Sequence, residues 1–289
     1  MSTTSRPRAE RLNDLDAKEW VRSTRSWFTC DGRPRSVTPE VEMHPASFPP
    51  EVPERFIRFF TRAGEVVLDP FLGSGGTLVA CVTTGRHGIG VELSERYCAA
   101  SRERVRRTVQ SPFRLDDAGK GPVPLSAEQT VICADARELA TLGVGPIDYC
   151  FTSPPYWDML RHSRGNVDSV HRERAQGGLD CVYSRDERDL GNIDEYEGYI
   201  EALAAVFAQV DEVLRPGKYA TIVMQNVRTR GGEMAPLAWD VARRLGAFWR
   251  LRQETIWCQS NKRLGCWGYP RTFVSNVHHH YCLTFQKDR

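Results

Sequence analysis

Residues 66–77 read Val-Val-Leu-Asp-Pro-Phe-Leu-Gly-Ser-Gly-Gly-Thr and join an apolar run to a glycine-rich turn. The run predicts a buried strand over 66–68, and the residues after the turn predict a helix over 76–84. The glycines in the turn permit positive φ angles and let a ligand approach the backbone closely. A strand, a glycine-rich turn and a helix in this order predict a nucleotide-cofactor site.

The spacing of the glycines narrows the class of ligand. It does not follow the Gly-x-Gly-x-x-Gly pattern of dinucleotide sites, and no Gly-Lys-Ser or Gly-Lys-Thr of a phosphate loop follows. A second strand, predicted over 88–92, ends in Glu92, which is expected to accept hydrogen bonds from both hydroxyls of a ribose. Asp135 follows a third strand over 130–133 and is a candidate acceptor for an adenine amino group. The alternative for each carboxylate is an N-cap or a turn.

A second motif, Thr-Ser-Pro-Pro-Tyr-Trp at 152–157, follows an apolar strand predicted over 147–151. Its prolines fix the backbone and remove two N–H donors. The Ser153 hydroxyl and the Pro154 carbonyl can then both act as acceptors, and Tyr156 offers a ring face for stacking. These features suit a flat ring that carries an amino group. The alternative is a proline-rich turn with Tyr156 packed in the core.

Predicted strands and helices alternate along the chain, which indicates an α/β fold. We expect a largely parallel, doubly wound sheet with helices on both faces. Ligands bind at the carboxyl ends of the strands in such a sheet, and both motifs fall there. A long amphipathic helix over 194–214 is expected to end at Pro216-Gly217, before a strand over 219–226. A further helix is expected over 234–245.

Composition and charge exclude several classes of protein. The 289 residues are 40% hydrophobic and 26% charged, which fits one globular catalytic domain. The net charge is only +2, so a DNA-binding face has to come from local clusters. The nine cysteines lack Cys-x-x-Cys spacing, and neither a zinc site nor a disulfide framework is expected. His278–His280 are expected in a turn that faces solvent or DNA. No apolar stretch is long enough for a membrane span, and a cytoplasmic protein is expected.

Together, the motifs resemble those of the amino-methylating DNA methyltransferases, which use S-adenosyl-L-methionine to modify cytosine N4 or adenine N6. Residues 69–77 are similar to the cofactor loop of that family, 90–92 to its ribose-binding strand and 153–156 to its catalytic motif. His44–Pro49 is similar to the segment that precedes the cofactor loop. Gly76 is a departure, because the family often has threonine there. Many members with Ser-Pro-Pro-Tyr also have the two main motifs in the reverse order, by circular permutation.

The resemblance implies a class I methyltransferase-like Rossmann fold, a set of site residues and no metal. The catalytic residues are expected to be Ser153, Pro154, Pro155 and Tyr156. The cofactor-binding residues are expected to be Pro45, Phe48, Asp69, Phe71, Gly73, Gly75, Thr77, Glu92 and Asp135. A Ser-Pro-Pro-Tyr motif is more similar to the cytosine-N4 enzymes, so N4-methylcytosine is the expected product and adenine N6 the alternative. An RNA base methyltransferase and a non-catalytic cofactor-binding regulator are further alternatives.

Two basic regions are candidates for contact with double-stranded DNA, the expected partner. The first, 158–190, contains Arg161, Arg164 and Arg172. The second, 261–271, contains Lys262, Arg263 and Arg271 beside two aromatic residues, a mixture that suits phosphate contact and base stacking. The alternatives are a solvated loop and an ordinary basic turn. Residues 1–43 are expected to form an N-terminal arm and 44–289 a single methyltransferase domain. A homodimer and a partner restriction endonuclease remain open.

Overall fold

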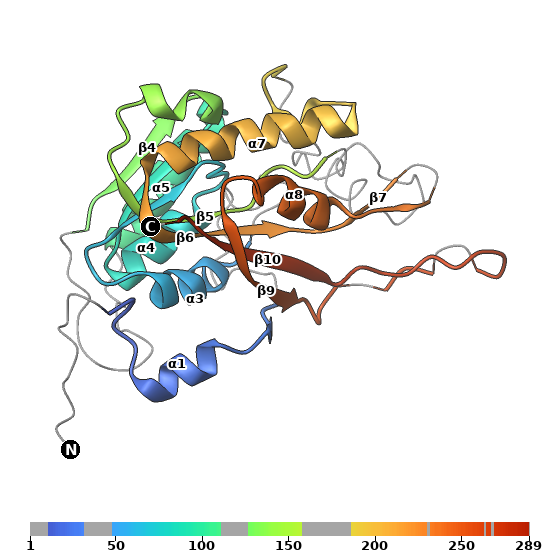
Figure 1. The fold of residues 1–289 in the computed structure, drawn as a ribbon, viewed down its shortest axis with the longest axis horizontal. Coiled ribbons are helices and arrows are strands. Elements are labelled where there is room, and N and C mark those ends of the chain that lie inside the picture. Colours follow the sequence, from blue (N-terminus) through green and yellow to red (C-terminus); the bar gives the residue numbers. More distant parts are fainter. Residues whose placement is uncertain are drawn as a thin grey trace.

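The computed structural model describes residues 11–31, 48–110, 127–157, 186–229, 232–262, 264–266 and 269–288. Its centre is an eight-stranded sheet in the order β1-β9-β10-β6-β5-β2-β3-β4 (Figure 1). The strands are β1 (Trp27–Thr29), β2 (Val66–Asp69), β3 (His87–Glu92), β4 (Gln129–Cys133), β5 (Ile147–Thr152), β6 (Leu214–Met224), β9 (Arg250–Cys258) and β10 (His279–Gln286). A separate ribbon pairs β7 (Val227–Arg228) with β8 (Met234–Ala235).

The sheet is largely parallel, as predicted from the alternation of strands and helices. Only β10 runs antiparallel to its neighbours, β6 and β9, and the other neighbouring pairs of this sheet are parallel. Parallel neighbours require a crossover connection, and helices supply most of these crossovers here. These crossovers are α4 (Gly76–Thr84), α5 (Glu95–Gln110) and α7 (Tyr196–Val213). The other described helices are α1 (Ala17–Ser23), α3 (Glu51–Phe60) and α8 (Leu237–Leu245), with the short 3₁₀ turns η2 (Ala136–Thr141) and η3 (Leu190–Asn192).

Two hydrophobic clusters lie on opposite faces of the sheet. In one cluster, α7 and α8 cover residues such as Cys150 of β5 and Leu283 of β10. In the other, α3 covers Tyr149 and Phe151 of β5 and Cys282 of β10. Successive residues of a strand point to opposite faces, so each of these strands contributes to both clusters. Figure 1 shows α7 and α8 above the sheet and α3 below it.

The end of α7 differs from the sequence prediction. The helix ends at Val213 and β6 begins at Leu214, so Pro216 and Gly217 lie inside a strand and do not form a turn before it. The pairing with β5 shifts between Ile147 and Tyr149, which oppose Leu214 and Tyr219. Proline cannot donate to a sheet ladder and is tolerated at such an irregularity. The predicted helix over 234–245 is also shorter, because residues 234–235 form β8.

The connectivity creates a switch point between β2 and β5. From β2 the chain proceeds outward through β3 to β4, and from β5 it proceeds the other way to β6. Ligands of open α/β sheets bind at the carboxyl ends of the strands beside such a point. Here β2 leads into the glycine-rich turn and β5 leads into Ser153. The topology therefore brings the two motifs together, although more than 70 residues separate them in the chain.

The amino-terminal part of the chain contributes a strand to the sheet. β1 lies within the expected N-terminal arm, and it pairs with β9 as an edge strand. Within the described ranges, no helix has the length and apolar character needed to cross a membrane.

We predict that Gly90→Ala destabilises the fold. A Cβ atom at this position of β3 would lie 2.5 Å from Leu72 Cδ2, so the buried Leu72 side chain would have to move. Overpacking of this kind costs about 1–3 kcal/mol of unfolding free energy. Gly145→Ala is the matched control, because no heavy atom lies within 4 Å of the added carbon. Chemical denaturation of both variants tests the prediction, which is contradicted if Gly90→Ala is as stable as the control.

Candidate active site

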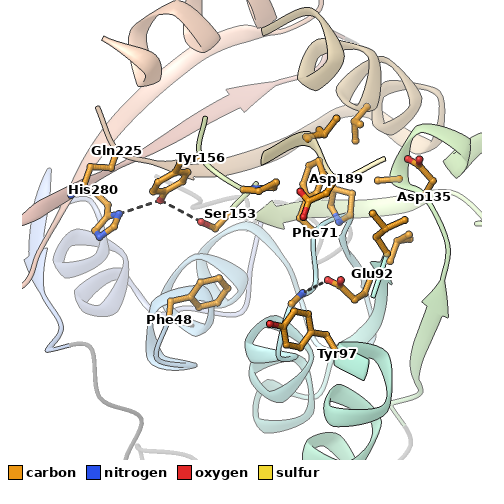
Figure 2. Close-up of a pocket in the computed structure, with 18 of the residues that line it drawn as sticks. Phe48, Phe71, Glu92, Tyr97, Asp135, Ser153, Tyr156, Asp189, Gln225 and His280 are labelled. Atoms are coloured by element: carbon orange, nitrogen blue, oxygen red, sulfur yellow. Dashed lines mark hydrogen bonds between the residues drawn. The ribbon is translucent and has the colours of Figure 1, made fainter. Parts of the chain in front are cut away.

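A cavity of about 340 Å³ opens at the carboxyl ends of the strands, beside the switch point. Both sequence motifs contribute to its wall (Figure 2). One end carries Glu92, Asp135 and Asp189, and the other end carries Tyr156 and His280. Ser153 lies between the two ends in Figure 2. This single cavity is large enough to hold part of a nucleotide-sized ligand at one end and a flat ring at the other.

The buried carboxylate of Asp69 fixes the glycine-rich turn through hydrogen bonds. It accepts hydrogen bonds from Thr77 Oγ1 (2.5 Å), Thr152 Oγ1 (2.6 Å) and the Phe71 backbone N–H (3.0 Å). Burial raises the pKa of Asp69 to about 6, against the opposing effect of these hydrogen bonds. Asp69 and Thr77 are fully buried and do not line the cavity. Both residues, predicted to contact the cofactor, instead support the turn that does line it.

The glycine-rich turn itself is fixed by helix α5. Ser101 Oγ donates to the Gly73 carbonyl (2.7 Å), and Arg104 donates to the Ser74 carbonyl (3.0 Å). Gly75 has φ = 84° and precedes α4, a conformation that L side chains rarely adopt. Phe71 and Gly73, both expected to bind the cofactor, line the cavity, whereas Gly75 faces Ser101. The turn therefore presents only part of its length to a ligand.

Glu92 closes the turn from the end of β3. Its Oε2 accepts from the Gly73 N–H and its Oε1 from the Ser94 N–H, both at 2.8 Å. Burial raises the pKa of Glu92 to about 7, although these two hydrogen bonds favour the ionised form. Each carboxylate oxygen has a second lone pair. Glu92 lines the cavity and can offer these lone pairs to a pair of hydroxyls.

Asp135 lies in the cavity wall, as expected of a residue that contacts the ligand. It is also the N-cap of η2, which was the alternative interpretation of this carboxylate. Its Oδ1 accepts from the Arg137 backbone N–H at 2.9 Å, at the start of η2. The guanidinium of Arg137 also donates to both carboxylate oxygens, at 2.6–3.1 Å. Burial opposes ionisation of Asp135, but the hydrogen bonds from Arg137 outweigh it and lower the pKa. Asp135 is therefore a fixed anion at this end of the cavity.

The Ser-Pro-Pro-Tyr motif turns sharply away from β5 into the cavity. Ser153, Pro155 and Tyr156 line it, whereas Pro154 is buried outside the lining. Tyr199 of α7 donates to the Pro155 carbonyl (2.8 Å) and fixes the turn. The Tyr156 hydroxyl lies 3.4 Å from Ser153 Oγ, 3.3 Å from the Val223 carbonyl and 3.2 Å from His280 Nδ1. A hydroxyl with three polar neighbours holds the ring of Tyr156 in one orientation.

His280 is a site residue that the sequence analysis missed. Its position in β10 contradicts the expectation that the histidine run forms a turn facing solvent or DNA. The ring stacks on Trp257, with centroids 4.6 Å apart and planes at 23°, and it lines the cavity. Burial lowers the pKa of His280 to about 3. No sequence motif includes His280, because its contact with Tyr156 depends on the antiparallel insertion of β10 beside β6.

Other predicted residues fall in different places. Phe48 and Lys262 line the cavity, and Arg271 is exposed in the connection between β9 and β10. Sequence reasoning also missed Asp189, Gln225 and Gln259, which line the wall from three different segments. The remaining predicted residues, Pro45, Arg161, Arg164, Arg172 and Arg263, lie outside the described residues.

Comparison with known proteins bears on this site. Residues 5–103 match the family model of the N6/N4 DNA methylases. Type II methyltransferase M.MjaI of Methanocaldococcus jannaschii is 42% identical over 86 residues, which are 29% of this chain and 28% of that protein. Orphan methyltransferase M.BamHII of Bacillus amyloliquefaciens is 33% identical over 96 residues, 33% of this chain and 36% of that protein. These matches cover about a third of the chain, and over that part the chain is similar to DNA methylases of the N6/N4 type.

The similarity of this chain to its relatives covers a limited part of each. Type II methyltransferase M.BglI of Bacillus subtilis is 35% identical over 95 residues, 32% of this chain and 26% of that protein. The chain thus matches 26–36% of the length of these three relatives. Among solved structures, TrmN from Thermus thermophilus has a TM-score of 0.50 at 16% identity, over 84% of this chain and 50% of that one. This likeness concerns the fold.

We predict that the stability of the protein falls as the pH rises from 5 to 8. Glu92 has its pKa raised from 4.5 to about 7 in the folded chain. The folded state therefore holds the Glu92 proton more tightly than the unfolded state. The resulting stabilisation is complete below pH 4.5 and is lost as the pH rises through 7. Glu92→Gln cannot ionise, so its loss of stability over this range should be smaller by on the order of 2 kcal/mol.

Chemical denaturation at pH 5, 6, 7 and 8 measures the effect. Some decline should persist in Glu92→Gln, because Asp69 also has a raised pKa, of about 6. Glu95→Gln, at an exposed position at the start of α5, is the matched control and should follow the wild-type curve. Parallel curves for Glu92→Gln and the wild type would show that the Glu92 carboxylate is not held protonated by the fold.

Proposed function

We propose that the chain is a DNA methyltransferase that transfers a methyl group from S-adenosyl-L-methionine to the exocyclic amino group of a flipped base, cytosine N4. One observation carries the proposal. Ser153 and Tyr156 of the catalytic motif line the same cavity as Gly73 and Glu92 of the cofactor motifs. Transfer requires the donor and the acceptor to be held together, and a shared cavity meets that requirement.

The residues at one end of the cavity fit the cofactor. The Glu92 carboxylate keeps lone pairs for the hydroxyls of a ribose, and the backbone at Gly73 permits close approach. Phe71 supplies an apolar surface, and Asp135 and Asp189 line the wall near Glu92. When bound, the cofactor supplies an electrophilic methyl group on a sulfonium. Glu92 is the residue that we expect to contribute most to cofactor binding, through hydrogen bonds between its carboxyl oxygens and the ribose hydroxyls.

The other end of the cavity fits an amino-bearing base. The lone pair of such an amino group is delocalised into the ring, which makes the nitrogen a poor nucleophile. Ser153 Oγ, which lines the cavity, can accept one amino hydrogen. The carbonyl of the adjoining Pro154, a residue outside the lining, is the proposed acceptor for the second. This pairing favours a pyramidal nitrogen whose lone pair is available. The Tyr156 ring offers its face to the base, and extraction of the base from a duplex costs roughly a few kcal/mol.

The choice of cytosine N4 rests on the serine of the motif. Ser-Pro-Pro-Tyr is more similar to the cytosine-N4 enzymes than to the adenine-N6 enzymes of the family. Serine can accept a hydrogen from either amine, so adenine N6 is the alternative within the same mechanism. Digestion of the methylated DNA to nucleosides and mass spectrometry decide between the two bases. Adenine as the sole methylated base would overturn the cytosine assignment.

We predict that Ser153→Ala slows methyl transfer by roughly 10²-fold, the usual effect of removing one positioned hydrogen-bonding group at a reacting centre. Binding of S-adenosyl-L-methionine should be unchanged, because Ser153 lies away from Glu92 in the cavity (Figure 2). Glu92→Ala should show the opposite pattern, with cofactor binding lost first. Transfer of tritiated methyl groups to DNA and to RNA, together with calorimetric titration of the cofactor, measures both effects.

Ser23→Ala, on α1 and outside the cavity lining, is the control for the serine substitution. Full activity of Ser153→Ala would refute the proposed site. Transfer to RNA in preference to DNA would retain the site and replace the substrate.

A second feature supports DNA as the substrate. The connection between β9 and β10, residues 259–278, extends well beyond the sheet in Figure 1, and we call it the arm. The sequence has no Asp or Glu from residue 255 to 287, and the arm itself contains Lys262, Arg263 and Arg271. Gln259 and Lys262 line the cavity at the base-binding end, so the arm begins at the proposed base site. A cationic arm at this place is suited to the phosphates of a nucleic acid.

The arm also exposes large apolar side chains. Leu264, Tyr269 and Phe273 are 78%, 81% and 91% exposed. Exposed apolar groups among cations are typical of surfaces that contact bases as well as phosphates. We expect these side chains to be covered when DNA is bound. The arm is therefore our proposal for a DNA-contacting region beside the base site.

We predict that Arg271→Gln weakens binding of duplex DNA. The slope of log K for binding against the logarithm of the salt concentration should become smaller in magnitude by about 1. Phe273→Ala should also weaken binding, but with an unchanged salt dependence, because it removes no charge. Fluorescence anisotropy with a labelled duplex at several salt concentrations measures both quantities. Arg252→Gln, at an exposed arginine of β9 away from the arm, is the matched control. Equal behaviour of the two arginine variants would exclude a role of Arg271 in DNA binding.

A further inference from the structure

A chain of polar side chains runs from the catalytic motif to the start of the arm. Ser153 Oγ lies 3.4 Å from the Tyr156 hydroxyl, which lies 3.2 Å from His280 Nδ1. His280 Nε2 in turn lies 3.1 Å from Gln259 Oε1. Figure 2 shows the first two contacts as dashed lines at the end of the cavity remote from Glu92. The residues come from three segments, and the proposed chemistry has so far used only Ser153 and Tyr156.

The ring of His280 is held rigidly. It stacks on Trp257, and the indole Nε1 of Trp257 donates to the Cys30 carbonyl at 2.8 Å. Gln259 is also fixed, because its backbone N–H donates to the His278 carbonyl at 2.8 Å. Burial lowers the pKa of His280, and the positive charge of Lys262 and the neighbouring His279 act in the same direction. The ring is therefore neutral at physiological pH.

A neutral imidazole has one N–H donor and one bare nitrogen acceptor. We assign the proton of the neutral ring to Nε2, because Gln259 Oε1, an acceptor, lies 3.1 Å from it. Nδ1 is then an acceptor, and it faces the Tyr156 hydroxyl. With this tautomer, Tyr156 donates its proton to Nδ1 or to the Val223 carbonyl, and its oxygen acts as the acceptor for the proton of Ser153. The assignment at Nε2 thus sets the direction of the hydrogen bonds toward Ser153.

This direction matters for the proposed reaction. Before transfer, the amino group of a base offers only hydrogens, because its lone pair is delocalised. A serine that accepts such a hydrogen has to direct its own proton elsewhere. We propose that His280 is a positioning residue that acts through Tyr156 to keep the Ser153 hydroxyl an acceptor for the amino group. This inference rests on the proposed methyl transfer and adds a residue that no motif includes.

The Val223 carbonyl limits the size of the expected effect. It lies 3.3 Å from the Tyr156 hydroxyl and is a second acceptor for the same proton. Loss of His280 would thus weaken the orientation of Tyr156 without abolishing it. A single hydrogen bond of this kind corresponds to about a 10-fold change in rate. The loss from Ser153→Ala should be larger, because that substitution removes the acceptor itself.

Three substitutions of His280 test the proposal. His280→Leu removes both polar atoms, His280→Asn places an amide near the position of Nδ1, and His280→Gln places it near Nε2. We expect kcat for DNA methylation to fall about 10-fold in His280→Leu and His280→Gln, and to recover largely in His280→Asn. The KM for DNA and the affinity for S-adenosyl-L-methionine should remain within about twofold, since a positioning effect concerns the transition state. A packing defect would not be rescued by asparagine alone.

A double substitution tests whether the effect passes through Tyr156. Tyr156→Phe removes the hydroxyl, so adding His280→Leu to it should cause no further loss of kcat. Gln259→Met serves as a second route if His280→Leu does not fold, because it removes the acceptor at Nε2 and leaves the imidazole in place. It should lower kcat several-fold.

Several results would overturn the proposal. They are a wild-type kcat in His280→Leu, an asparagine variant no faster than the leucine variant, and independent losses in the double variant. Full activity of Gln259→Met would also contradict it. These outcomes presuppose a wild-type chain that methylates DNA. Absence of transfer by the wild type would instead refute the proposed function, so the two failures can be told apart.

Discussion

The hydrogen bonds to the Asp69 carboxylate are the constraint on which the rest of the site depends. Thr77 lies in the first turn of α4, and Thr152 directly precedes Ser153. Both side chains donate to this one buried group. The two motifs are thereby fixed to the same point at the switch between β2 and β5. A displacement of either strand would separate the carbonyls of the turn from the acceptor serine. Burial of the carboxylate is unfavourable, as its raised pKa of about 6 shows, and three donors offset that cost.

The two ends of the cavity differ in their electrostatics. Glu92, Asp135 and Asp189 bring carboxyl groups to one end, where Arg188 also lines the wall and Arg137 pairs with Asp135. The other end has the neutral His280 and the amides of Gln225 and Gln259, with Lys262 nearby. Carboxyl acceptors suit the hydroxyls of a nucleoside, and a neutral polar end suits an uncharged heterocycle. The polarity of the cavity therefore agrees with the direction of transfer that we propose.

The parts of the fold that depend on local sequence could be predicted well. Helix α4 occupies residues 76–84 as expected, because its glycine-rich start and apolar face are encoded within a few residues. The site residues that follow β2, β3 and β5 could be placed at one sheet edge for the same reason. Local signals failed at Pro216 and Gly217, where pairing with β5 draws a turn-like dipeptide into a strand. His280 was missed because its neighbours belong to segments more than 20 residues away in the chain.

The pairing of β1 with β9 links the amino-terminal part of the chain to the interior of the site. β1 covers one outer edge of the sheet, and the adjoining Cys30 carbonyl accepts the proton of the Trp257 indole. Without this strand, β9 would present unpaired backbone groups along its length, and exposed edges of this kind invite association between molecules. Trp257, on which the His280 ring stacks, would also lose its hydrogen bond to the Cys30 carbonyl. Residues about 250 positions before His280 in the chain thus support the wall of the cavity. The same short strand covers a sheet edge and fixes an active-site side chain.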